Sequence, residues 1–264
     1  MKTIGLITAI REEAKYFYAK HSFEKEMSFS RDYYVSVEDN TKIILVHSHP
    51  GPVNSSAATE SLIINFLPDI IINTGSAGSH DIEIHPGDVV IGDRYTINYN
   101  IEEVERGKIK EKKGSLIRFI KNRKIRSFDY LLPDRYLLRL AQELSSKVNL
   151  ERIPLHDYFD SHNVPRDPRI LTAGIGSEEH WTVDVELIEK KKSFFGHKIE
   201  DKESAFIAQI CHFHDVPFIS IRGISDNELI KRTVGYETVY RLIELSSINA
   251  AKLVDKMIEE IELT

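Results

Sequence analysis

Two carboxylates stand at junctions between elements near the end of the sequence. Glu203 precedes the apolar run Ser204 to Cys211, and Asp226 ends the run Pro217 to Ser225. The first run is typical of a buried helix and the second of a buried strand. Ligands of open α/β sheets bind outside the carboxyl ends of the strands. We interpret both acids as candidate site residues, although a helix dipole or a turn would explain either of them taken singly.

A segment of small residues follows another apolar run. Asp69 to Thr74 predicts a buried strand, and Gly75-Ser76-Ala77-Gly78 comes directly after it. Such a turn brings main-chain N–H groups and the Ser76 hydroxyl close to a ligand. A tight connection to a helix would use the same residues for conformational reasons alone. The segment lacks the Gly-Lys-Ser/Thr of a P-loop and the third glycine of a dinucleotide fingerprint.

A pair of acids follows the first apolar run, Thr3 to Ile10. Glu12 and Glu13 stand where this strand gives way to a helix, close to the edge expected for the glycine segment. One of them is a candidate general base that takes a proton from water. Acids in a first helical turn are also favoured by the helix dipole, which explains at least one of the pair.

Strands and helices alternate along most of the chain, and this order positions the acids. The patterns predict strands at 3–10, 42–47, 69–74, 86–91, 170–173 and 217–226, and helices at 54–66, 135–147, 205–214 and 236–261. This alternation predicts an α/β protein with three layers, α/β/α, around a central, largely parallel mixed sheet. The sequence shows neither an internal repeat nor a low-complexity linker, so we expect one domain over residues 1–264.

The overall composition is that of an ordinary globular protein. The chain has 264 residues, of which 41% are hydrophobic and 29% charged, and its net charge of −6 gives no reason to expect nucleic acid as a partner. No run resembles a signal peptide or a membrane span. The single cysteine, Cys211, excludes an intramolecular disulfide and a thiolate metal site. We expect a cytoplasmic protein without a membrane partner.

One segment departs from this composition. Residues 106–126 hold ten Lys or Arg against a single acid, Glu111. Runs of like charge are usually solvated, so we interpret the segment as a basic insertion or exposed loop. The alternative is that it attracts an anionic ligand or partner.

The spacing of the histidines and of the tryptophan alone gives little evidence of a functional site. The sequence has no His-Glu-x-x-His or comparable metal motif, so a zinc site is not expected. His212 and His214 lie near a helix end, where the dipole favours them. Trp181, the only tryptophan, follows the strand predicted at 170–173. It either packs in the core or stacks on a flat base.

Taken together, these segments resemble the nucleoside phosphorylase and nucleosidase superfamily, and most closely its methylthioadenosine/S-adenosylhomocysteine nucleosidases. The resemblance rests on four motifs in the same order: residues 9–13, residues 71–78 with 86–90, Glu203 with its apolar helix, and residues 216–226. It covers most of the chain, and 106–126 has no counterpart.

The resemblance implies hydrolysis of the bond between adenine N9 and ribose C1′, without metal or cofactor. Adenine leaves poorly as an anion, so an acid must protonate N7 while the sugar acquires oxocarbenium character. Asp226 matches this acid, which needs a raised pKa in a water-poor pocket. Glu12 matches the carboxylate that orients and deprotonates water. Glu203 matches the one that holds the ribose hydroxyls.

The resemblance also implies a set of substrate-binding residues and a homodimer. Base stacking falls to Trp181 or His180 by approximate position, and the 5′ pocket to Tyr236. The remaining candidates surround the three acids: Ser76, Ala77, Gly78, Arg222, Ser225 and Lys202. Family members are commonly homodimers in which a neighbour's loop closes the 5′ pocket.

Two positions bear on the reaction and the substrate. Bacterial phosphorylases of this superfamily carry Arg where this chain has Asn73, and the acids at 12–13 would repel phosphate, so water is the expected nucleophile. The nucleosidases usually carry Met where this chain has Lys202, which pairs with Glu203, points to solvent or favours an anionic 5′ group. The alternatives are a phosphorylase or nucleotide (AMP-type) nucleosidase, and a nucleoside-binding module without turnover.

Overall fold

The computed structural model describes residues 1–28, 31–98, 117–153, 166–230 and 236–262. In this part of the chain, nine strands form one sheet in the order β10-β9-β6-β11-β5-β1-β4-β3-β2. Their bounds are β1 (Lys2–Thr8), β2 (Glu24–Ser28), β3 (Arg31–Glu38), β4 (Thr41–His47), β5 (Ile70–Ser79), β6 (Val89–Ile97), β9 (Ile170–Ser177), β10 (Ile199–Asp201) and β11 (Phe218–Asn227).

The sheet is mixed, and it closes on itself at one end. Strands β4, β1, β5 and β11 run parallel to one another. Strand β6 is antiparallel to β11, and the short β10 is parallel to β9 but antiparallel to β5. Strands β5, β11, β6, β9 and β10 therefore form a closed ring. The ring brings the carboxyl ends of β5 and β11 beside β10.

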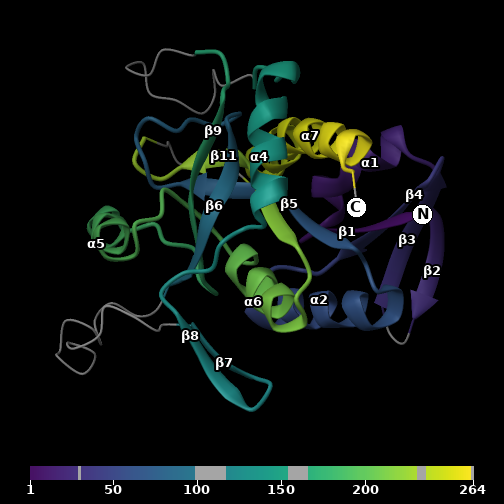
Figure 1. The fold of residues 1–264 in the computed structure, drawn as a ribbon. Helices are drawn as coiled ribbons and strands as arrows, with labels where there is room; N and C mark the ends of the chain where they lie inside the picture. The colour runs from purple at the N-terminus through teal and green to yellow at the C-terminus, as the bar shows by residue number, and fades with distance from the viewer. Residues whose placement is uncertain (29–30, 99–116, 154–165, 231–235, 263–264) are drawn as a thin grey trace.

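Helices cover both faces of the sheet, as Figure 1 shows. Helices α2 (Pro52–Phe66) and α6 (Ser204–His214) pack together on one face. Helices α1 (Lys15–Lys20), α4 (Arg135–Leu144) and α7 (Tyr236–Glu260) lie on the other. Two apolar clusters fill the layers, one on each side. The predicted fold class, a three-layer α/β/α arrangement around a mixed sheet, is confirmed.

The helices begin and end where local chemistry favours it. The Asp134 side chain accepts hydrogen bonds from the backbone N–H groups of Tyr136 and Leu137 at the start of α4. Helix α5 (Val185–Phe195) has the same type of cap at Asp184 and ends at Gly196 in the left-handed region. Such caps satisfy backbone groups that a helix leaves without partners.

Several elements differ from the sequence-based expectation. The segment Gly75 to Gly78 was expected as a turn, but it continues β5, because β11 pairs with it on one side and β10 on the other. Strands β2, β3 and β10 and helix α5 were not predicted. The described part of the basic segment forms a hairpin, β7 (Ile117–Lys121) and β8 (Lys124–Phe128), and residues 106–116 lie outside the described residues.

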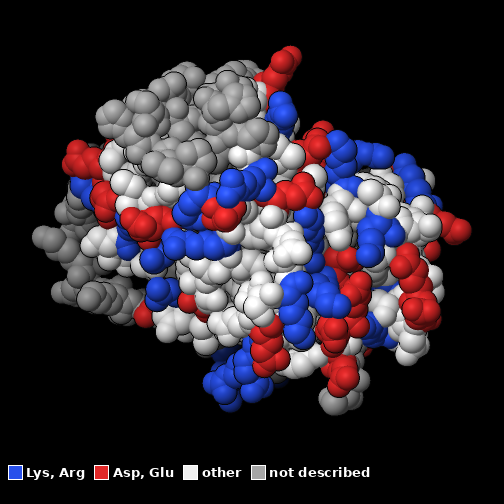
Figure 2. All heavy atoms as spheres, turned by 90° about the horizontal axis from the view of Figure 1, so that it is seen from above, with Lys and Arg blue, Asp and Glu red and all other residues white. Residues whose placement is uncertain are grey.

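The surface carries charges of both signs. On the face seen in Figure 2, from above the view of Figure 1, Lys and Arg lie interspersed with Asp and Glu among uncharged residues. Helices long and apolar enough to cross a membrane are absent from the described residues.

Candidate active site

A buried carboxylate, Glu13, joins the end of β1 to β5. It lies in a short 3₁₀ turn, Arg11–Ala14, and is only 4% exposed. Its Oε2 accepts hydrogen bonds from the N–H groups of Ala9 (2.7 Å) and Ile10 (3.3 Å). Its Oε1 accepts from the N–H (2.8 Å) and the hydroxyl (3.0 Å) of Ser76. The carboxylate is thus fixed against the small-residue segment of β5.

Gly75 makes the approach of Glu13 possible. It has φ +149°, and a Cβ at this position would lie 2.5 Å from the Glu13 carboxyl carbon. Any other residue would push the carboxylate off the strand. The glycine segment thus admits an acid, and it does so as a strand rather than as a turn.

The structure separates the two neighbouring acids, Glu12 and Glu13. Glu12 is exposed, whereas Glu13 and Ala14 turn inward together with Phe17. Our choice of Glu12 as the acid facing the nucleophile therefore needs correction, because the geometry offers Glu13. The signal was in the sequence: Phe17 follows Glu13 by four residues, which places the two on one helical face.

A second carboxylate is held by a fully buried arginine. Arg222 on β11 is 0% exposed; its Nη2 binds Glu203 Oε2, and its Nε lies 2.8 Å from Asp201 Oδ2. Glu203 lies at the N-terminus of α6, as expected, and its Oε1 also accepts from the N–H of Gly51 at 3.3 Å. The guanidinium thus fixes both acids at the same end of the sheet.

The electrostatics of this group are mutually compensating. The pKa of Glu203 is raised to about 7, chiefly by burial; Arg222 opposes the rise, and Asp201 and Glu13 add to it. Burial alone would lower the pKa of Arg222, but Asp201, Glu203 and Glu13 raise it. The electrostatic interactions of Glu13 and Glu203 with each other and with Arg222 place the three residues in one cluster.

The third carboxylate, Asp226, lies near the end of β11, opposite Gly78. A bulge between Ile224 and Asp226 leaves Ser225 outside the ladder, and Asp226 then pairs with Gly78. The Ser225 hydroxyl donates to Asp226 Oδ1 at 2.6 Å and also lies 3.3 Å from the carbonyl oxygen of Ala77. Bulges often redirect a side chain beside a site. Here the bulge directs a half-buried acid to the β5 terminus.

Comparisons with known proteins agree with this geometry. A model of the Phosphorylase superfamily matches residues 3–259. The chain belongs to the phosphorylase superfamily. In the structure, Glu13, Glu203 and Asp226 lie at one end of the sheet, and their roles stay a prediction.

Curated relatives and solved structures match this protein over most of its length. A 5′-methylthioadenosine/S-adenosylhomocysteine nucleosidase of Halalkalibacterium halodurans is 28% identical over 259 residues, covering 96% of each chain. One from Staphylococcus aureus is 27% identical over 263 residues, covering 98% of this chain and 100% of the relative. The futalosine hydrolase structure of Helicobacter pylori has a TM-score of 0.77 at 21% identity and covers 98% of both chains. The nucleosidase structure of the same organism has a TM-score of 0.77 at 20% identity and covers 98% of this chain and 99% of that one.

Trp181 lies over the same part of β5 as Asp226. A Cβ on Gly78 would overlap the Trp181 indole and lie 3.1 Å from Asp226 Oδ2. The indole Nε1 donates to Glu228 Oε1 at 2.7 Å. The structure therefore brings the tryptophan, rather than the exposed His180, to the carboxylate. An aromatic plane beside an acid suits a flat heterocycle.

For two predicted site residues, Lys202 and Tyr236, the described structure gives no contact with the three acids. Lys202 is half-buried, and its ammonium has no ion pair or hydrogen bond among the described residues. It does not pair with Glu203. Tyr236 begins α7, but its side chain lies outside the described part of the structure.

Sequence reasoning missed two partners of the acids. Asp201 binds Arg222 and caps α6 by accepting from the N–H of Ser204 at 3.1 Å. Gly51, which donates its N–H to Glu203, was assigned only to a turn. An acid shortly before an apolar helix is a capping signal that would have pointed to Asp201. Gly51 has no such signal, because its partner is distant in the sequence.

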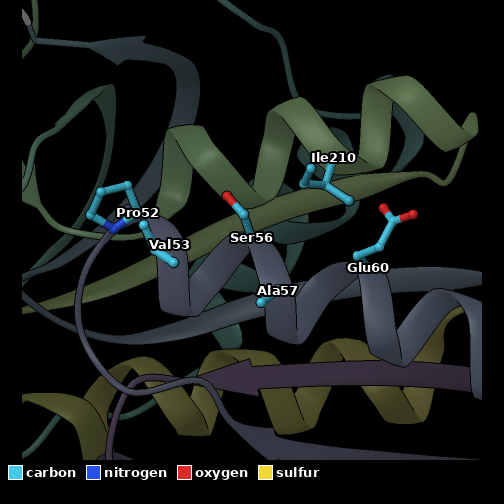
Figure 3. Close-up of a pocket in the computed structure, with 6 residues that line it drawn as sticks. All are labelled: Pro52, Val53, Ser56, Ala57, Glu60 and Ile210. Atoms are coloured by element: carbon cyan, nitrogen blue, oxygen red, sulfur yellow. The ribbon is translucent and has the colours of Figure 1, made fainter.

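The site is separate from the depression between α2 and α6. That depression is lined by small and apolar side chains with one acid, Glu60, at its end, as Figure 3 shows: Pro52, Val53, Ser56, Ala57, Glu60 and Ile210. It includes none of Glu13, Glu203 or Asp226. Its lining includes the acid Glu60 but no aromatic side chain on which a nucleobase could stack.

Proposed function

We propose that this chain hydrolyses the N-glycosidic bond of an adenine ribonucleoside of the 5′-methylthioadenosine or S-adenosylhomocysteine type and releases adenine. The observation that carries the proposal is the placement of two acids, from different elements, against nearby residues of β5. Glu13 binds Ser76, and Asp226 pairs with Gly78 two residues along the same strand. Those positions are about 7 Å apart on a strand. Two acids near the scissile bond are what glycoside hydrolysis needs, one to protonate the leaving group and the other to activate the attacking water.

Each acid has a distinct part in this mechanism. Asp226 protonates N7 of the departing adenine, which otherwise leaves as an anion. Glu13 accepts a proton from the water that attacks C1′. Glu203 accepts hydrogen bonds from the ribose hydroxyls and stabilises the positive charge that the sugar acquires. Arg222 keeps Glu203 oriented, so that it is a positioning residue.

The electrostatics favour water over phosphate. The charge of the Arg222 guanidinium is already compensated by Asp201 and Glu203, which weakens its attraction for a phosphate ion. Asn73 is fully buried, donates to the carbonyl of Ile7, and accepts from Ser204 and Ser220. Glu13 would repel an anion at the position of the nucleophile. These features support hydrolysis.

The relatives support the reaction class and leave the 5′ group to be tested. The curated relatives carry the name of a methylthioadenosine/S-adenosylhomocysteine nucleosidase, and one similar structure is a futalosine hydrolase. The unpaired Lys202 specifically favours the second candidate, an enzyme for a nucleoside or nucleotide with an anionic 5′ group. We further infer one domain over residues 1–264, acting in the cytoplasm without a cofactor.

One assay decides between these functions. The protein is incubated with methylthioadenosine, adenosine or AMP, with and without phosphate, and free adenine is followed. We expect phosphate-independent release that is fastest from methylthioadenosine. A preference for AMP supports the second candidate. A phosphate requirement, or binding without release, contradicts the proposed hydrolysis.

We also propose a homodimer, as the resemblance implies. Helix α2 exposes Val53 at 78% and Ile64 at 62%, and Val53 borders the depression in Figure 3. A second copy covering this face would remove apolar surface from water. Light scattering should give the mass of a dimer, and Val53→Glu should shift it toward the monomer. A monomeric wild type at micromolar concentration contradicts the proposal.

A further inference from the structure

A second polar cluster lies behind the candidate active site, where β5 meets β10. His80 directly follows β5, His197 precedes β10, and Glu200 lies in β10. The three are 0%, 2% and 1% exposed, respectively. Glu200 pairs with Gly78. Asp226 and Trp181 also lie against Gly78, so the cluster adjoins the candidate active site. Nothing in the proposed reaction uses these side chains.

The two histidines have few partners for groups so deeply buried. His80 Nδ1 and His197 Nε2 are 3.2 Å apart and share one hydrogen bond. Among the described residues, His80 Nε2 and His197 Nδ1 have no hydrogen-bond partner. Burying a polar atom without a partner is costly. In the tautomer in which His80 Nδ1 donates to His197 Nε2, the lone pair of His80 Nε2 is not used by the described residues.

Among the described residues, the Glu200 carboxylate has no positively charged group that pairs with it alone. Lys191 lies 3.8 Å from Glu200 Oε2, but its ammonium contacts Glu178 more closely and so has a nearer acid. Glu200 is held instead by uncharged donors: the N–H and hydroxyl of Thr182, each at 2.9 Å, and the amide of Asn98 at 3.4 Å. A buried carboxylate is costly to ionise without a compensating positive charge.

These donors match the ligands of a borderline divalent cation. We propose that His80, His197 and Glu200 form a buried binding site for a divalent metal ion of the Zn²⁺ type. One ligand atom of each residue lies within 4.8 Å of the others. His80 Nε2 and Glu200 Oε1 are 3.8 Å apart, which is close to the span of two bonds of about 2.0–2.1 Å that meet at one ion. His197 completes the set by exchanging its hydrogen bond to His80 for a bond to the ion.

The surroundings suit this role. Gly176 leaves space for the His197 ring, because a Cβ there would lie 2.8 Å from its Cγ. Thr182 and Asn98 orient the carboxylate from outside, as second-layer partners do in metal sites.

No sequence motif indicates this site, because its residues are far apart in the chain. His80 and His197 are separated by 117 positions, whereas short metal-binding motifs place ligands within a few residues of one another. An ion would tie the end of β5 to β10 and, through Thr182, to the segment that carries Trp181. We infer a structural ion and not a catalytic one, since the ligands are sealed from solvent.

Metal content tests the proposal directly. The full chain is produced in medium supplemented with Zn²⁺ and, separately, Co²⁺, passed over a chelating column to remove loosely bound ions, and analysed by elemental mass spectrometry. We expect one ion per chain and, with Co²⁺, a visible absorption spectrum that differs from that of the hydrated ion. His80→Gln and His197→Gln should lose both signals. The control His212→Gln, a half-buried histidine near the end of α6, should keep them.

Two results would overturn the inference. The first is wild-type protein that retains no metal after supplementation. The second is metal retained equally by His80→Gln and His197→Gln, which would place it elsewhere. If either variant fails to fold, the wild-type content and the Co²⁺ spectrum still decide. Adenine release is a separate measurement, so failure of this site leaves the proposed function unaffected.

Discussion

The chain buries two polar clusters at the end of β5, and they differ in how their charges are balanced. In the candidate active site, Arg222 compensates Glu203 and Asp201, while Ser76 and Asp226 stay half-open to solvent. In the histidine cluster, Glu200 has uncharged donors, and two ring nitrogens have no hydrogen-bond partner in the described part of the chain. The first arrangement suits a substrate that enters and leaves. The second suits a ligand that stays, because a sealed cluster exchanges slowly with solvent.

The largest effect that follows from this contrast is at Asp226. Asp226→Asn should lower the rate of adenine release by about 10²–10⁴-fold, because an amide cannot protonate the leaving base. Bound metal should be unchanged. The control Asp167→Asn alters an exposed ion pair with Arg152 and should be near wild type in both measurements. Near-normal turnover in Asp226→Asn would show that the acid is misassigned.

The neighbouring acids Glu12 and Glu13 provide a matched pair. Glu13→Gln should reduce turnover by about 10²–10³-fold through loss of a general base. Glu12→Gln should change it less than twofold, because Glu12 is exposed. Steady-state rates with methylthioadenosine, together with circular dichroism, separate chemistry from folding. The reverse order of effects would restore Glu12 to the mechanism.

Stability against pH probes the charge balance around Glu203. Its pKa rises from 4.5 to about 7 on folding, chiefly through burial. The folded state therefore holds the proton more tightly, and the resulting stability, complete below pH 4.5, is lost as the pH rises to about 7. Glu203→Gln lacks this titration. The free energy of unfolding, measured with urea across this range, should fall more steeply in wild type, and parallel curves would contradict the assignment.

The smallest effect concerns the 5′ group. Lys202→Met removes an ammonium without a partner among the described residues. If that ammonium meets the 5′ substituent, kcat/KM for AMP should fall by a few-fold, and kcat/KM for methylthioadenosine should stay equal or rise, as expected for a weak, partly exposed charge interaction. The ratio of the two values is the measurement. An unchanged ratio would assign Lys202 to the surface.

The sequence predicted those parts of the fold that carry a strong local pattern. Strands β1, β4, β5 and β11 were recognisable as continuous apolar runs. Strand β2 was missed because its charged residues face solvent and show no apolar alternation, and β10 because three residues are too few for a period. Local pattern is informative only where an element buries its own side chains.

The site shows the same limit. Glu203 and Asp226 could be chosen because each ends or begins a patterned element. The choice between Glu12 and Glu13 depended on the rotation of one short turn, which only packing against Phe17 and β5 fixes. The partners Asp201 and Gly51, and the cluster of His80 with His197, join segments that are distant in the chain. Such contacts are set by the tertiary fold.

The sheet ends differently on its two sides, and this governs how copies of the chain can meet. Where β10 bridges β9 and β5, the strands of the described residues form a closed ring, so none of these strands has a free edge for a neighbour. At the other end of the sheet, β2 is an exposed edge strand, and its side chains include Glu24, Lys25 and Glu26. Charged borders discourage strand addition between molecules, which is a common first step toward fibrils. Neutralising that border, rather than altering the ring, is the change that would turn this protein toward insoluble assembly.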